Sequence, residues 1–87
     1  MNYDILLLYE RRDMMYRLKE GVYEAIKNSR PGFKVVKLAE EVGIKSTFAS
    51  LVLNRRRTCS RMTAYCICKA LDSSYEIKDL FVNEKGE

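Results

Sequence analysis

Apolar residues recur at steps of three and four through most of the chain between Met15 and Phe81, and this spacing restricts the fold most strongly. A side chain returns to the same face of an α-helix after three or four residues, so the pattern predicts amphipathic helices. The chain has only 4 Gly and 1 Pro in 87 residues, which argues against a turn-rich sandwich or barrel. The sequence therefore predicts one all-α domain.

The first helix is expected over residues 14–29, with Asp13 as its N-cap. Pro31 and Gly32 end it, because proline disfavours helical backbone at the residue before it and glycine permits a turn. The residues expected on its buried face are Met15, Leu18, Val22, Ala25 and Ile26.

Four more helices are expected, over residues 34–42, 46–54, 60–71 and 75–83. Gly43 ends the first of these as a left-handed residue, Lys45 or Ser46 caps the next, and Ser60 caps the third. The residues expected to face the core are Val35, Leu38, Ala39, Val42, Ala64, Ile67, Cys68, Leu71, Ile77, Leu80 and Phe81.

Residues 1–12 form a separate arm, and residues 84–87 are expected to be a frayed tail. The arm contains an apolar run that either extends the first helix backwards or forms a strand pairing with a second chain. Because any helix or strand leaves one side of such a run uncovered, we expect it to contribute to a homodimer interface, and an arm that folds back over the first helix of its own chain is the alternative. The residues of this run are Ile5, Leu6, Leu7, Leu8 and Tyr9.

Basic charge is concentrated in residues 45–61, which hold five basic and no acidic side chains. The rest of the chain carries 11 basic and 12 acidic residues, so this window accounts for the whole net charge of +4. A local basic patch is typical of a polyanion-binding surface, although a solvated basic loop gives the same pattern. Within it, Arg55, Arg56 and Arg57 are suited to bind phosphates. The alternative is a solvated loop whose charge aids the solubility of the protein.

The composition argues against an enzyme and against bound cofactors or metals. Histidine is absent, which excludes Ser-His and Cys-His nucleophile pairs and His-ligated metal sites. The cysteines Cys59, Cys66 and Cys68 offer no fourth ligand and are expected to be small apolar side chains in or near a helix. Their odd number suits a reducing compartment, and the apolar run of the arm is too short to span a bilayer, so we expect a cytoplasmic protein with no membrane partner.

Residues 38–52 have the features of two helices that cross closely at a steep angle. Ala39 provides a small residue where the second helix approaches, and Gly43 provides the positive φ of the turn. The second helix then projects short polar or basic side chains from its N-terminal end, where the helix dipole favours an anion. These side chains belong to Lys45, Ser46, Thr47 and Ser50. An ordinary helical hairpin is the alternative.

Residues 34–82 resemble the lambda-repressor-like, XRE-type helix-turn-helix domain. The stretch from Leu38 to Ile44 is similar to the first helix and turn of that motif, and Ser46 to Asn54 is similar to its recognition helix. The stretches Ser60 to Leu71 and Tyr75 to Phe81 are similar to the fourth and fifth helices of the family. The resemblance implies a five-helix domain over residues 13–83 that binds double-stranded DNA.

The resemblance implies a sequence-specific transcriptional regulator, similar to small phage, plasmid or prophage repressors, that acts as a homodimer on the duplex. The residues expected to read bases are Lys45, Ser46, Thr47 and Ser50. The residues expected to contact phosphates are Lys34, Asn54, Arg55, Arg56, Arg57 and Arg61. The alternative is a protein-binding inhibitor or antitoxin module on the same fold, because an acidic protein surface would also suit the basic window.

Overall fold

The structure is a computed structural model that describes residues 15–84, and these form a mostly helical fold with a small two-stranded sheet. Five helices occur in this part of the chain, in the expected order, and 56% of it is helical. The helices are α2 (Val22–Ser29), α3 (Val35–Val42), α4 (Ser46–Leu53), α5 (Arg61–Leu71) and α6 (Ile77–Leu80). The strands are β1 (Tyr16–Leu18) and β2 (Phe81–Asn83).

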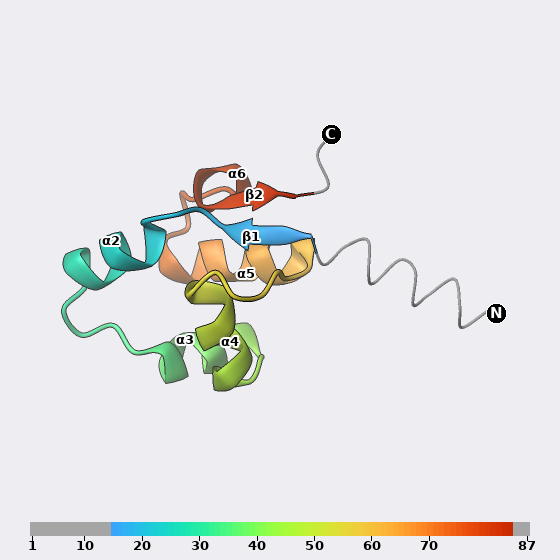
Figure 1. The fold of residues 1–87 in the computed structure, drawn as a ribbon. Helices are drawn as coiled ribbons and strands as arrows, with labels where there is room; N and C mark the ends of the chain where they lie inside the picture. The colour runs from blue at the N-terminus through green and yellow to red at the C-terminus, as the bar shows by residue number, and fades with distance from the viewer. Residues whose placement is uncertain (1–14, 85–87) are drawn as a thin grey trace.

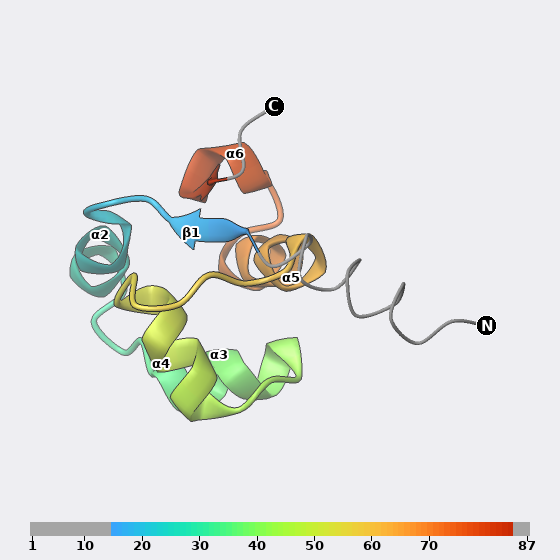
Figure 2. The same ribbon diagram turned by 45° about the vertical axis from the view of Figure 1, so that its right-hand side comes forward.

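The long helix α5 lies between two groups of elements (Figure 1). The sheet and α6 lie on one side of it, and α3 and α4 lie on the other, an arrangement that the rotated view repeats (Figure 2). Ser60 caps α5 as expected, because its hydroxyl oxygen accepts a hydrogen bond of 3.1 Å from the amide of Thr63. A capped helix at the centre of the fold fixes the positions of both groups.

The hydrophobic core surrounds α5 and draws on every part of the described chain. Most of the residues expected to face inward are buried. They are Leu18, Ile26, Leu38, Ala39, Ala64, Ile67, Cys68, Leu71, Leu80 and Phe81. Val35, Val42 and Ile77 are partly buried and pack against the same cluster.

The expectation of a helix over residues 14–29 was wrong for its N-terminal half. Tyr16–Leu18 form a strand that pairs antiparallel with β2, with Leu18 opposite Phe81. Gly21, at φ +85°, turns the chain before α2 begins at Val22. Leu18 is buried from the strand, whereas Ala25, expected on the buried face, is exposed. Asp13, the expected N-cap, lies outside the described residues.

The last helix is also shorter than expected, and the all-α expectation was wrong in this respect. Helix α6 ends at Leu80, and Phe81–Asn83 continue as β2. Glu84, expected to begin a frayed tail, is part of the fold. Its amide donates to the carbonyl of Met15 at 2.8 Å, and its carboxylate pairs with Arg17 at 2.6 Å. The two ends of the described chain are therefore joined to each other.

None of the helices in residues 15–84 is long and apolar enough to cross a membrane.

Candidate nucleic-acid interface

The corner between α3 and α4 is built as the sequence predicts. Gly43 adopts φ +87°, a left-handed conformation that a side chain disfavours. The amide of Ile44 donates to the carbonyl of Ala39 at 3.0 Å, which is the six-residue bond that closes many helix ends. Ala39 in α3 and Ala49 in α4 are both buried. The chain turns over residues Gly43 to Lys45, and α4 begins at Ser46.

The exposed face of α4 is polar at its N-terminal end and includes Leu51 one turn further on, and the other face belongs to the core. Ala49, Val52 and Leu53 are buried. The exposed side chains at the N-terminal end are those of Lys45, Ser46 and Thr47, and Ser50 lies half-buried one turn further on. We define Lys45, Ser46, Thr47 and Ser50 as the α4 face. The structure thus brings together the four residues expected to read bases, with Ser50 the least accessible of them.

Asn54 and Arg55 are engaged in holding the loop after α4. The side-chain amide of Asn54 donates to the carbonyl of Ser50 at 2.8 Å. Arg55 has φ 63°, which is unusual for a residue other than glycine. Its Nε donates to the carbonyl of Leu18 at 2.8 Å, and its own carbonyl accepts from Nη1 of Arg17 at 2.6 Å. Part of the Arg55 guanidinium is therefore bound to strand β1.

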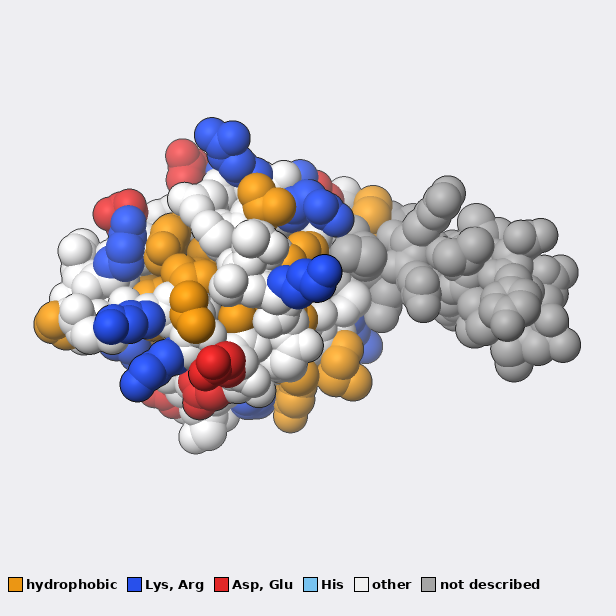
Figure 3. All heavy atoms as spheres, turned by 90° about the horizontal axis from the view of Figure 1, so that it is seen from below, with side chains coloured by type: hydrophobic (Ala, Val, Ile, Leu, Met, Phe, Trp, Pro, Cys, Tyr) orange, Lys and Arg blue, Asp and Glu red, His pale blue; other side chains and the backbone are white. Residues whose placement is uncertain are grey.

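Arg56 and Arg57 are exposed beside the C-terminal end of α4. The guanidinium carbon of Arg57 lies 5.4 Å from the centre of the Phe48 ring, a cation–π distance that keeps this charge next to α4. Lys34 is exposed at the start of α3. Figure 3 looks at the side on which α3 and α4 lie and shows more Lys and Arg than Asp and Glu side chains.

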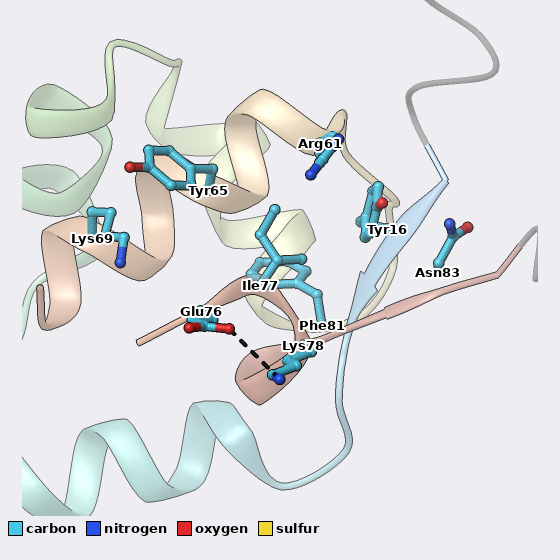
Figure 4. Close-up of a pocket in the computed structure, with 9 residues that line it drawn as sticks. All are labelled: Tyr16, Arg61, Tyr65, Lys69, Glu76, Ile77, Lys78, Phe81 and Asn83. Atoms are coloured by element: carbon cyan, nitrogen blue, oxygen red, sulfur yellow. Dashed lines mark ion pairs between the residues drawn. The ribbon is translucent and has the colours of Figure 1, made fainter. Parts of the chain in front are cut away.

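Arg61 lies elsewhere, in a groove on the side of α5 that faces α6 and β2 (Figure 4). The groove has a volume of about 600 Å³. Its lining residues are Tyr16, Arg61, Tyr65, Lys69, Glu76, Ile77, Lys78, Phe81 and Asn83. The sequence reasoning missed it, although Arg61, Tyr65 and Lys69 recur at steps of four, which places them on one face of α5.

The buried cysteines have the properties of core residues. Burial raises the pKa of Cys59 to about 12, and burial together with the nearby Asp79 carboxylate raises that of Cys68 to about 11. Cys59 is not in a helix, since it exchanges backbone hydrogen bonds of 3.0 and 2.8 Å with Tyr16. Within residues 15–84, no three His, Cys, Asp or Glu side chains gather as a metal ion would require.

The residues expected to form the dimer interface, Ile5 to Tyr9, lie outside the described part of the chain. Comparisons of this chain with protein-family models, curated proteins and solved structures find no match.

Proposed function

We propose that the protein is a sequence-specific DNA-binding transcriptional regulator in which α3 and α4 act as a helix-turn-helix and α4 is the recognition helix. One observation carries the proposal. Helix α4 exposes Lys45, Ser46 and Thr47 at its N-terminal end while its opposite face is fixed in the core. The fold that we propose is the lambda-repressor-like one, which the resemblance of residues 34–82 implies.

The chemistry of the α4 face suits a DNA duplex. The major groove is about 12 Å wide and admits an α-helix, and hydroxyl and ammonium groups there can hydrogen-bond base edges. The positive end of the helix dipole favours the phosphates beside the groove. Arg56, Arg57 and Lys34 supply further positive charge at the edges of the two helices, and none of the residues in the window 45–61 is acidic.

The phosphate-binding role depends less on three other residues. Arg55 and Asn54 hold the loop, and Arg61 lines the groove beyond α5. We propose that Arg56, Arg57 and Lys34 make the main phosphate contacts. Two copies would read two half-sites about 34 Å apart on one face of the duplex. A repressor of phage or plasmid type, acting in the cytoplasm, is the form of regulator that we propose.

The test begins with selection from a pool of random duplexes, followed by titration of the selected sequence and of a random one. We expect an inverted repeat to be enriched. Thr47→Ala should cost about 1–3 kcal/mol on the selected site and less on random DNA, because a lost base contact affects only the specific complex.

The matched control is Ser73→Ala, which removes an exposed hydroxyl in the turn after α5 and should leave both affinities unchanged. An equal loss for Thr47→Ala on both duplexes would assign Thr47 to phosphate binding. If no duplex is enriched, the proposal fails, and the alternative of an inhibitor or antitoxin that binds an acidic protein takes its place.

A further inference from the structure

The groove between α5, α6 and β2 combines an apolar floor with a cationic rim. Phe81 is buried at its base, and Ile77 lies half-buried between the two helices (Figure 4). Tyr65 is 49% exposed, and Met62, which lines the adjoining hollow, is 67% exposed. Large apolar side chains at this exposure mark a surface that lacks a covering layer.

Three cations surround this floor. Arg61 and Lys69 come from α5 and Lys78 from α6, while Glu76 is the single acidic residue of the lining. Glu76 is itself paired with Lys78, at 3.7 Å. The net positive charge around an apolar floor favours a polypeptide segment whose apolar residues are bracketed by carboxylates.

The chain contains such a segment at residues 4–10. Asp4 and Glu10 bracket the apolar run Ile5–Tyr9, and residues 1–10 contain no Lys or Arg. Its charge and its apolar content both match the groove.

The spacing of the charges also agrees. Arg61 and Lys69 are eight residues apart on α5, which is about 12 Å along a helix axis. Asp4 and Glu10 are six residues apart, a step of about 9 Å in a helix and about 20 Å in an extended chain. Both carboxylates can therefore reach the two ends of the rim.

We propose that the groove binds residues 4–10 of a second copy of this chain, so that two copies exchange their arms. The proposal rests on the dimer in the proposed function. The groove is lined by residues of α5, α6 and the two strands, and α6 and the strands lie on the opposite side of α5 from α3 and α4 (Figures 1 and 2). The exchange therefore leaves the α4 face of each copy uncovered.

The area available is sufficient for a stable dimer. Each large apolar side chain that becomes fully buried removes about 60–120 Å² from water. With three of the five apolar side chains of each arm facing the groove, two arms contribute about 360–720 Å², and the two grooves lose a similar area. The total of about 700–1,400 Å² reaches the lower end of the roughly 1,200–2,000 Å² of specific interfaces.

Charge reversal in two separate chains tests the exchange. One variant carries Asp4→Lys and Glu10→Lys, and the other carries Arg61→Glu and Lys69→Glu. Each alone should sediment as a monomer at a concentration where the wild type is a dimer, because like charges meet in the groove. An equimolar mixture should regain the dimer, because each arm then meets an opposite charge on the partner.

The matched control is Lys19→Glu with Arg30→Glu, which makes the same change of charge at exposed positions outside the groove and should leave the dimer intact. The proposal is overturned if each reversed variant remains a dimer, or if the mixture stays monomeric. A wild type that is monomeric at all concentrations overturns it as well.

A second measurement covers the case in which a reversed variant does not fold. A photo-crosslinking residue replaces Tyr65 in a mixture of full chains, half of them labelled with a heavy nitrogen isotope. Crosslinks from position 65 to residues 1–10 should join light and heavy peptides. Crosslinks confined to one isotope would show that each groove holds its own arm and would overturn the exchange.

The two proposals fail separately. If the copies exchange arms but no duplex is preferred, the DNA-binding function fails and the exchange stands. If a duplex is selected but both charge-reversed variants still sediment as dimers, the exchange fails and DNA binding stands.

Discussion

The α4 face and the groove beyond α5 are both basic, yet they differ in what surrounds the charge. On α4 the cation Lys45 stands beside hydroxyl side chains, and most of the apolar residues of that helix are buried or half-buried, with Leu51 exposed by 36%. In the groove Arg61, Lys69 and Lys78 surround exposed or half-exposed aromatic and aliphatic side chains. The first surface offers hydrogen bonds to a polar polyanion, and the second also offers apolar area to cover.

This difference explains why net charge alone does not assign a partner. A cation among hydroxyl groups remains solvated and suits a phosphate backbone and base edges. A cation around an apolar hollow suits a chain that buries hydrocarbon and keeps its carboxylates at the rim. The comparison predicts that changes on one surface leave the other intact unless they alter the shared core.

The largest effect on stability is expected in helix α5, because both the α4 face and the groove depend on it. Ile67 is fully buried in α5, the helix that lies between the α3–α4 pair and the sheet (Figure 1). Ile67→Ala should lower the free energy of unfolding by about 2–5 kcal/mol, because it removes buried methyl groups and leaves a cavity. Thermal melting followed by circular dichroism measures this. Val36→Ala, at a position that is 56% exposed, is the control, and equal melting temperatures for the two variants would contradict the central role of α5.

The second prediction concerns the phosphate contacts proposed for Arg56 and Arg57, which lie beside α4 and outside the groove. Arg56→Ala and Arg57→Ala should weaken binding to all duplexes alike, because phosphate contacts carry no sequence information. Each lost contact should flatten the slope of log K against log salt by about 0.9. Titration at several salt concentrations measures the slope. Arg30→Ala removes an exposed arginine elsewhere and should leave the slope unchanged. A slope that stays constant in Arg56→Ala and Arg57→Ala would exclude the phosphate role.

A third prediction concerns the link from the loop after α4 to the sheet. Arg55→Ala loses the hydrogen bond to the Leu18 carbonyl and keeps a left-handed backbone that a side chain disfavours. Arg55→Gly loses the same bond but relieves the backbone. Arg55→Gly should therefore be more stable than Arg55→Ala by up to about 1 kcal/mol. Urea unfolding of both variants measures the difference, and a less stable glycine variant would contradict the conformational argument.

The smallest effect concerns Glu84. The hydrogen bond and the positive charge of Arg17 hold the pKa of the Glu84 carboxyl below its usual 4.5. The ion pair therefore stabilises the fold above about pH 4.5, and its contribution is lost as the pH falls through the lowered value. An NMR titration should give a Glu84 midpoint below 4.5 that rises towards it in Arg17→Ala. A midpoint unaffected by this substitution would show that the pair does not form in solution.

The sequence predicted the middle of the fold better than its ends, and the reason is the range of the interactions. Gly43 and Ser60 act on their own helix ends, so local sequence signals were sufficient. Strand β1 depends on pairing with Phe81–Asn83, more than 60 residues away. A three-residue strand has too short an apolar pattern to be distinguished from a helical turn.

The candidate site divides in the same way. The exposure of Lys45, Ser46 and Thr47 followed from helical periodicity and was predictable. The left-handed backbone of Arg55 was not, because no local signal distinguishes this arginine from Arg56 and Arg57. The groove depends on contact between α5 and elements that follow it, so its residues were seen only as separate parts of two helices. The DNA-binding roles remain predictions.

The backbone bridge between Tyr16 and Cys59 makes the Cys59 thiol a probe of the opening of strand β1. An exposed thiolate is the nucleophile that attacks a thiol-labelling reagent, whereas Cys59 is fully buried and burial raises its pKa to about 12. It should therefore react at neutral pH only when β1 separates from the body of the fold. The rate at which Cys59 is labelled, followed by mass spectrometry, therefore reports the rate at which β1 separates from the rest of the fold. Binding of a partner that immobilises β1 should lower this labelling rate, and the measurement needs no engineered cysteine.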